Sequence, residues 1–357
     1  MRRSLLPFLV LLTSLASAEV TNIGSRRELF VDKLLIDQMQ GATLRLHHPE
    51  EAGIAVKFDQ PWEGRFSAYI TVIHNDEADK FQMYYRGNAG FKDGTNGEVT
   101  CYAESTDGIR WVKPKLGLHE INGSKDNNVM LANLAPYTHN FAPFIDGRPG
   151  VPKEQRYKAL AGLGGKSGGL SAFVSADGLH WQKMQEAAVI TKGAFDSQNV
   201  SFWSEAEQCY VAYFRVFTAG VIDEKTWKPK GVRWVSRATS KDFLTWTDAV
   251  QMTSDQPLAD HIYVSQTNPY FNAPHLYIST AARFMPGKEG DGTEKGRTAF
   301  RLAGNIIAYA TGLEAPQPRL TRRKIVDLKD EKVQPRHQLQ IAQVKHEGDW
   351  QPAPQAM

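Results

Sequence analysis

The chain has 357 residues, of which 42 are Lys or Arg and 39 are Asp or Glu, and it contains two cysteines. Its basic residues are scattered among acidic ones, which argues against a nucleic-acid partner, because such a partner requires Lys and Arg gathered on one face. A chain of this length builds a core without disulfide staples, so Cys101 and Cys209 form one bridge at most and are equally consistent with two buried free thiols.

The N-terminus has the pattern of a secretory signal peptide. Met1-Arg2-Arg3 is followed by an apolar run over residues 5–15 and by the small residues 16–18 (ASA). This pattern predicts cleavage after Ala18, with a retained N-terminal anchor as the alternative. No second run of about 20 apolar residues follows. We therefore expect no membrane span after cleavage, and a secreted or periplasmic protein.

A ten-residue unit recurs along the chain. Residues 102–111 (YAESTDGIRW) reappear as 172–181 (AFVSADGLHW) and, more loosely, as 237–246 (RATSKDFLTW). Each copy predicts a β-strand, a turn in which Asp caps the backbone and Gly adopts positive φ, and a Trp that opens the next strand. The spacing of the copies suits one four-stranded sheet per repeat, as in the blades of a β-propeller.

Further strand pairs lie between these units, and helical periodicity is nearly absent, so we expect an all-β fold. The pairs are residues 69–73 with 81–86, 141–145 with 157–161 and 200–203 with 210–215, and residues 263–284 begin a fourth blade. The pattern ends after Phe284, which leaves open whether the last blade is complete. We expect residues 28–36 and 44–47 to supply strands that close the ring. The predicted domains are a propeller over residues 25–312 and a divergent polar tail over residues 313–357.

Four segments resemble a largely uncharacterised bacterial family of exported propeller proteins. They are residues 26–37 (RRELFVDKLLID), 61–64 (PWEG), 83–87 (MYYRG) and 193–199 (GAFDSQN). That family is similar to the five-bladed superfamily of glycoside hydrolase families 32, 43, 68 and 117. The resemblance covers roughly residues 25–284 and implies a five-bladed β-propeller whose blades are four-stranded and antiparallel.

Glycoside hydrolysis requires carboxylates that face each other across the central funnel, and we expect them at the blade entries. Asp196 is the first candidate, because residues 195–203 are similar to the Arg-Asp-Pro segment that contacts substrate in invertase-like enzymes. Its arginine and proline are absent here, and a turn-capping aspartate is the alternative. Glu63 is the second candidate, as a general acid beside Trp62, with a surface glutamate as the alternative. The second blade entry carries Asn140 where the superfamily commonly has a carboxylate.

The predicted substrate-binding residues are aromatic, amide and basic side chains at the same blade entries. They are Trp62, Tyr69, Asn140, Gln198, Asn199, Arg215, Asn268, Tyr270 and His275. Arg86, Arg215 and Arg283 follow strands at similar positions and, if they point inward, favour a carboxylated or sulfated sugar. Strand-end arginines on the rim are the alternative.

We expect an extracytoplasmic glycoside hydrolase-like protein that acts as a monomer on oligo- or polysaccharides. A non-catalytic carbohydrate-binding propeller and a truncated pseudoenzyme are the alternatives. The sequence assigns no metal and no cofactor, although the resemblance to family 43 allows a calcium ion on the propeller axis. Neither the sugar nor the stereochemical course follows from the residues.

Overall fold

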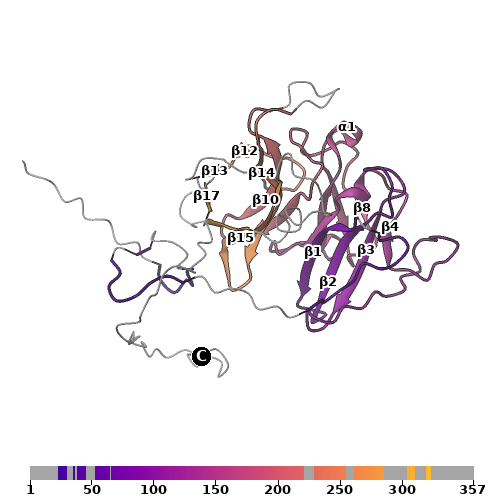
Figure 1. Ribbon diagram of the computed structural model, residues 1–357, viewed down its shortest axis with the longest axis horizontal. Helices are drawn as coiled ribbons and strands as arrows, with labels where there is room; N and C mark the ends of the chain where they lie inside the picture. The colour runs from indigo at the N-terminus through magenta and orange to yellow at the C-terminus, as the bar shows by residue number, and fades with distance from the viewer. Residues whose placement is uncertain are drawn as a thin grey trace, which may run out of the picture. The chain divides into compact units, whose positions relative to one another are not determined.

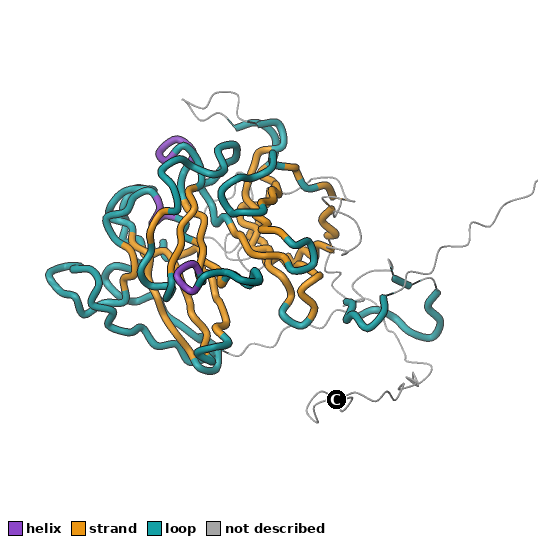
Figure 2. The backbone as a smooth tube through the Cα atoms, turned by 180° about the vertical axis from the view of Figure 1, so that it is seen from behind, coloured by secondary structure: helices purple, strands orange, loops and turns teal. Residues whose placement is uncertain are grey.

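The computed structural model describes residues 23–29, 35–36, 38–45, 53–64, 66–220, 229–254, 261–284, 304–309 and 319–322. The chain divides into two compact units, and the larger one spans Glu51–Lys324. Within the described residues of that unit, helix is limited to three short segments, η1 (Tyr137–His139), η2 (Lys153–Gln155) and α1 (Gly164–Ser167) (Figure 2). None of the described helices is long and apolar enough to cross a membrane. The larger unit is therefore built from β-strands, as the sequence predicted.

Three four-stranded antiparallel sheets follow one another along the chain (Figure 1). In each sheet the strands lie side by side in chain order, so each is a simple meander. The first sheet contains β1 (Ala68–Asn75), β2 (Lys80–Gly87), β3 (Val99–Ser105) and β4 (Val129–Leu131); the second contains β5 (Ala142–Ile145), β6 (Tyr157–Ala161), β7 (Ser171–Ser175) and β8 (Gln182–Lys183); the third contains β9 (Val200–Ser204), β10 (Cys209–Phe217), β11 (Arg233–Ser240) and β12 (Val250–Gln251).

A fourth sheet extends beyond the point at which the sequence pattern ends. It begins with β14 (His261–Tyr270) and β15 (Ala273–Phe284), and it continues with β16 (Gly304–Tyr309) and β17 (Arg319–Arg322). The short strand β13 (Thr253–Ser254) adds to β17 in parallel. The predicted boundary at residue 312 thus falls inside this sheet. A fifth blade remains a prediction, since the described residues form four sheets.

The N-terminal stretches expected to close the ring do not form strands where the structure describes them. Residues 28–29, 35–36 and 44–45 carry no strand, and they belong to the smaller unit, which spans Met1–Glu50 and Ile325–Met357. Residues 30–34 and 46–47 of these stretches lie outside the described residues. Residues 1–18 lie outside the described residues, so the signal peptide remains a prediction.

The first strands of the sheets contact one another in the order β1, β5, β9 and β14. This is the radial arrangement of propeller blades, with the first strand of each blade innermost. Three hydrophobic clusters of buried residues pack within and between the blades. Cys101 and Cys209 are both buried and free, which decides between the two alternatives left by the sequence.

In the second, third and fourth blades, a tyrosine on the second strand hydrogen-bonds to the preceding blade. Tyr157 hydroxyl accepts from Asn75 Nδ2 at 2.8 Å, and Tyr210 hydroxyl donates to Asp146 Oδ2 at 2.7 Å. Tyr277 hydroxyl contacts Ser204 Oγ at 2.5 Å and Glu207 Oε1 at 2.6 Å. We call these three residues the interblade tyrosines. Each reaches the end of the neighbouring innermost strand at which the chain turns back.

The recurring turns share one hydrogen-bond pattern. In the second blade, Ser175 Oγ accepts from the amide of Gly178, and Asp177 Oδ1 accepts from the amides of Leu179 and His180. Trp181 Nε1 then donates to the carbonyl of Gly178 at 3.0 Å. The third-blade turn keeps this pattern although Phe243 stands at the glycine position, with φ +70°. The buried Phe243 ring packs against Tyr210 and Phe144, which offsets the cost of the left-handed backbone.

These turn glycines allow a matched test of packing between blades. Gly108 and Gly178 have similar positive φ, +71° and +78°, so Ala costs each about 1–2 kcal/mol of backbone strain. A Cβ at Gly178 would lie 2.5 Å from the hydroxyl of buried Tyr84 in the first blade, whereas one at Gly108 meets only the Phe81 ring at 3.6 Å. We expect Gly178→Ala to destabilise the protein by about 1–3 kcal/mol more than Gly108→Ala, measured by urea unfolding. Equal losses would contradict close packing between the first two blades at this turn.

Candidate active site

Asp196 lies in the loop before β9, and 47% of its side chain is exposed. Two cationic side chains contact it: His139 Nε2 lies 3.1 Å from Oδ1, and Arg215 Nη2 lies 3.7 Å from Oδ2. The hydrogen bond from His139 is the main cause that lowers the pKa of Asp196, and Arg215 adds to it against the effect of burial. Asp196 is therefore a carboxylate that is held ionised and is accessible to solvent.

His139 lies fully buried at the end of η1, with a carboxylate on each side of its ring. Nδ1 is 3.0 Å from both oxygens of Glu98, and Nε2 faces Asp196. Burial acts against the charged imidazole, but the hydrogen bonds to Asp196 and Glu98 outweigh it and raise the pKa of His139. The raised pKa favours an imidazolium that donates from both nitrogens, and the nearby charge of Arg86 opposes it. Arg86 Nη1, 3.6 Å from Glu98 Oε1, shares this carboxylate with His139.

Glu98 immediately precedes β3 and contacts the side of the His139 ring that faces away from Asp196. It is fully buried, and it accepts from Asn88 Nδ2 at 2.9 Å and from the amide of Gly94 at 2.6 Å as well as from His139. Burial raises the pKa of a carboxyl group, but here the hydrogen bonds and the charge of His139 prevail and lower the pKa of Glu98. Its charge is neutralised within the protein, so Glu98 positions His139 and does not face the solvent.

Two tyrosines pack against the cationic partners of Asp196. Tyr69 and Tyr263 hydroxyls lie 3.4 Å apart, and the guanidinium groups of Arg86 and Arg215 lie over their rings at 4.5 and 4.8 Å respectively. Tyr69 has φ +55°, a left-handed conformation that is a real outlier for a bulky residue, at an irregularity in the β1–β2 register. Backbone strain of this kind concentrates at functional sites. Tyr69, which the sequence predicts to contact substrate, lies against His139, a partner of Asp196.

Two asparagines hold the Asp196 loop in place. Asn140 Nδ2 donates to the carbonyls of Phe195 and Ser197 at 2.7 and 3.0 Å, and Asn199 Nδ2 donates to the same two carbonyls. Asn140 Oδ1 accepts from the amide of Gly162. Both side chains are buried, and both donate to backbone carbonyls on either side of Asp196. The structure places Asn140 and Asn199 behind the site, where they fix the position of Asp196.

The innermost strands meet at a group of amides. Gln198 Nε2 and Gln266 Nε2 both donate to the carbonyl of Ile70, and Gln266 Nε2 also lies 2.6 Å from Gln198 Oε1. Calcium requires a shell of oxygen ligands. Here the Ile70 carbonyl and Gln198 Oε1 already accept hydrogen bonds from glutamine N–H groups. These residues do not fit the axial calcium ion that the resemblance allows.

One group of potential metal ligands lies at the site itself. Asp93, Glu98 and His139 each offer an atom within 4.8 Å of the others. Arg86 Nη1 already lies 3.2 Å from His139 Nδ1, 3.6 Å from Glu98 and 3.9 Å from Asp93. The guanidinium of Arg86 therefore supplies the positive charge that a metal would bring, and the three residues do not fit a metal ion.

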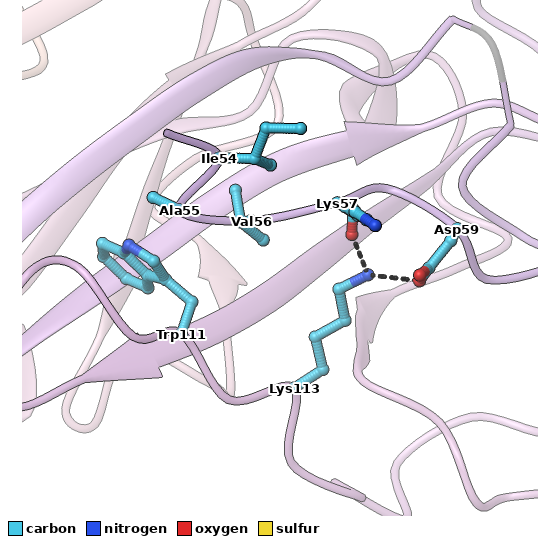
Figure 3. Close-up of a pocket in the computed structure, with 7 residues that line it drawn as sticks. All are labelled: Ile54, Ala55, Val56, Lys57, Asp59, Trp111 and Lys113. Atoms are coloured by element: carbon cyan, nitrogen blue, oxygen red, sulfur yellow. Dashed lines mark hydrogen bonds and ion pairs between the residues drawn. The ribbon is translucent and has the colours of Figure 1, made fainter. Parts of the chain in front are cut away.

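Glu63 lies elsewhere in the first blade. It is fully buried and accepts from Tyr85 hydroxyl at 2.5 Å and from Lys113 Nζ at 2.7 Å. Lys113 also contacts the carbonyl of Lys57 and the carboxylate of Asp59 at the rim of a surface hollow (Figure 3). Neighbouring Trp62 donates to Asn128. The structure thus gives Glu63 the contacts of an internal ion pair that ties residues 54–59 to the blade, and it does not bring Glu63 into contact with the Asp196 cluster.

The three predicted residues of the fourth blade lie away from Asp196. β14 begins at His261, and Tyr263 near this start contacts Tyr69. Asn268 and Tyr270 stand at the other end of this ten-residue strand, where Tyr270 packs on Phe271 in the hairpin turn. His275 follows at the start of β15. The sequence places the blade entry at Asn268, whereas the strand starts seven residues earlier.

Several side chains of the cluster were not singled out from the sequence. His139 stands next to Asn140 at a predicted blade entry, so its position gave a usable signal. Glu98 and Asp93 precede β3 in a loop without a recognisable motif, and Arg233 opens β11 in the same way. Their meeting follows from how the blades are arranged around the axis, which no local pattern encodes.

Comparison with known proteins gives a consistent but distant likeness. No family model matches the chain, and no curated protein matches its sequence. Among solved structures, a glycoside hydrolase is 15% identical with a TM-score of 0.46, and 77% of each chain is covered. A thermostable family-43 glycoside hydrolase is 11% identical with a TM-score of 0.46, covering 74% of this chain and 75% of the other. The fructofuranosidase of Schwanniomyces occidentalis is 12% identical with a TM-score of 0.42, covering 78% of this chain and 52% of the other. Two of the three are glycoside hydrolases by name and one is a fructofuranosidase, and at these values they do not assign an activity to this chain.

Proposed function

We propose that this protein is an extracytoplasmic glycoside hydrolase in which Asp196 is the carboxylate that acts at the anomeric carbon. The observation that carries the proposal is the half-exposed Asp196 carboxylate, held ionised between His139 and Arg215 near the point where the blades converge. An ionised carboxylate is required both of a nucleophile and of a base that activates water, and it stabilises the positive charge that develops on the sugar.

Hydrolysis also requires a proton donor for the leaving oxygen. Asp93 is a second exposed carboxyl group of the cluster, with 63% of its side chain accessible. One of its oxygens lies within 4.8 Å of a ring nitrogen of His139, which in turn contacts Asp196. The two carboxyl groups are therefore at most roughly 10 Å apart, a limit that includes the separations used by retaining and inverting glycosidases. We assign the proton donor to Asp93.

The two tyrosines suit a sugar substrate. Tyr69 and Tyr263 each combine an apolar ring with a hydroxyl, and such rings bind the C–H face of a sugar while the hydroxyl reaches a polar group. Both rings are held in place by arginines, so little conformational entropy is lost on binding.

A carbohydrate-binding protein without hydrolytic activity is the second candidate. It is favoured by the full burial of Glu98, which commits the carboxylate nearest His139 to structural contacts. Such a protein would need the tyrosines and arginines of the site but not the acidity of Asp93.

The first test is a release assay with a panel of neutral and acidic oligosaccharides, read by mass spectrometry. We expect wild-type protein to release sugar and Asp196→Asn to be slower by at least about 100-fold, because the amide can neither attack nor activate water. Asp76→Asn, in an exposed turn of the first blade, is the control and should keep full activity. Binding of a glycan without release in folded wild-type protein would support the second candidate instead.

The charged state of His139 makes a prediction about pH. Its pKa is raised in the folded protein, so its stabilising contribution is complete below the unfolded value of about 6.5 and is lost as the pH rises through the folded value. The pKa values of Glu98 and Asp196 are lowered, so their contributions persist at neutral pH and are lost as the pH falls through their folded values. We expect the stability advantage of wild type over His139→Gln to be largest near pH 6 and to shrink steadily toward pH 9, measured by thermal unfolding. A difference that stays constant over this range would show that the pKa of His139 is not raised in the folded protein.

A further inference from the structure

The arginine that opens β11, Arg233, lies close enough to Asp196 for their charges to interact, but not at ion-pair distance. Among the described residues, no Asp or Glu lies within ion-pair distance of Arg233, and its buried Nε atom has no hydrogen-bond partner. The nearest acceptor of its guanidinium is His261 Nδ1, 3.4 Å from Nη1, and that nitrogen already accepts from the Arg233 amide. A partly buried guanidinium with so few acceptors is costly unless an anion completes it.

A second arginine shares the same surface. Arg215 and Arg233 lie on adjacent antiparallel strands, and Phe217, which pairs directly with Arg233, is on the same face as both. The Phe217 ring centroid lies 5.8 Å from the Arg215 guanidinium carbon and 5.3 Å from that of Arg233. Burial and the charge of Arg215 lower the pKa of Arg233 from its usual range. The two positively charged guanidinium groups are therefore held close together beside one apolar ring, that of Phe217.

Aromatic rings set the direction of both guanidinium groups. Arg233 lies 3.9 Å over the ring of Phe284, and Arg215 lies 4.8 Å over that of Tyr263. Tyr263 and Phe284 are themselves stacked, with centroids 6.3 Å apart. An arginine stacked on a ring keeps its planar N–H edge free for in-plane hydrogen bonds, which is the geometry that recognises carboxylate or sulfate.

The charge of the whole cluster favours an anionic ligand. Among the described residues, the basic side chains of the cluster are Arg86, His139, Arg215 and Arg233, and the acidic ones are Asp93, Glu98 and Asp196. Glu98 is shared by Arg86 and His139, and Asp196 by His139 and Arg215. The uncompensated positive charge therefore falls on the Arg215–Arg233 side.

We infer that Arg215 and Arg233 form an anion subsite next to Asp196, which selects sugars that carry a carboxylate or sulfate group. This inference rests on the proposed carbohydrate site and specifies its substrate class. The sugar ring lies against Tyr263, and its acidic substituent accepts hydrogen bonds from the two guanidinium groups. A carboxylate and a sulfate both present negatively charged oxygen atoms, in a planar and a tetrahedral group respectively. The ligand is therefore either a uronic acid or a sulfated sugar.

The test uses equilibrium binding, which does not require turnover. The probes for calorimetry are galacturonic acid, galactose 6-sulfate and galactose as methyl glycosides, which differ only at C6. We expect wild type to prefer at least one acidic probe over galactose, and Arg233→Gln to reduce that preference at least tenfold. Arg110→Gln, which changes an exposed arginine of the first-blade turn, is the matched control and should retain it. The ratio between the two acidic probes distinguishes uronic acid from sulfate.

The outcomes separate this inference from the proposed function. Selective binding of an acidic probe that depends on Arg233 supports the subsite even if no glycan is hydrolysed. Equal affinity for acidic and neutral probes, or a preference unchanged in Arg233→Gln, overturns the subsite even if Asp196-dependent hydrolysis is found. Thermal unfolding of each variant shows whether a lost preference reflects a loss of the fold. In that case Arg233→Lys, which keeps the charge but loses the planar edge, is measured instead, and an unchanged preference again overturns the subsite.

Discussion

The hydroxyl groups of the interblade tyrosines fix how neighbouring blades sit against each other. Tyr157, Tyr210 and Tyr277 occupy equivalent places and reach Asn75, Asp146 and the Ser204–Glu207 turn respectively. These contacts lie at one end of the innermost strands, and the Asp196 cluster lies at the other. Since residues of the first, second and third blades meet around Asp196, a change in the angle between blades would separate its partners. The buried hydrophobic clusters that join neighbouring sheets supply apolar burial, whereas the hydroxyls supply direction.

The site is held together by charges that are largely compensated within the protein. Glu98 is fully buried and still ionised because His139, Asn88 and the Gly94 amide all donate to it. Its effect reaches Asp196 through the imidazolium ring. Asn140 and Asn199 complete the arrangement by holding the backbone on both sides of Asp196. The geometry of the exposed carboxylate therefore depends on buried residues that a ligand would never touch.

The parts of this fold that follow from local patterns were predictable, and those that follow from contacts between blades were not. The recurring Ser-x-Asp turns and the first two strands of the first three blades follow from short, repeated segments, and they occur where the sequence predicts them. Asp196 and Arg215 were found because they flank such segments. Arg233 and Glu98 had no local signal, since only the packing of the blades brings them to the site. The places of Asn268 and Tyr270 depend on the length of β14, which alternation alone does not fix.

Two demands on position 69 oppose each other. Its backbone is left-handed, a conformation that glycine adopts without strain, while its ring supports Arg86 and adjoins His139, which glycine cannot do. No residue type satisfies both requirements, so position 69 carries the tyrosine side chain and its backbone is strained. The position is locally frustrated, in the sense that the energy of the isolated segment and the arrangement of the site favour different residues. A homologue in which this residue is glycine would have relaxed the segment and given up one wall of the site.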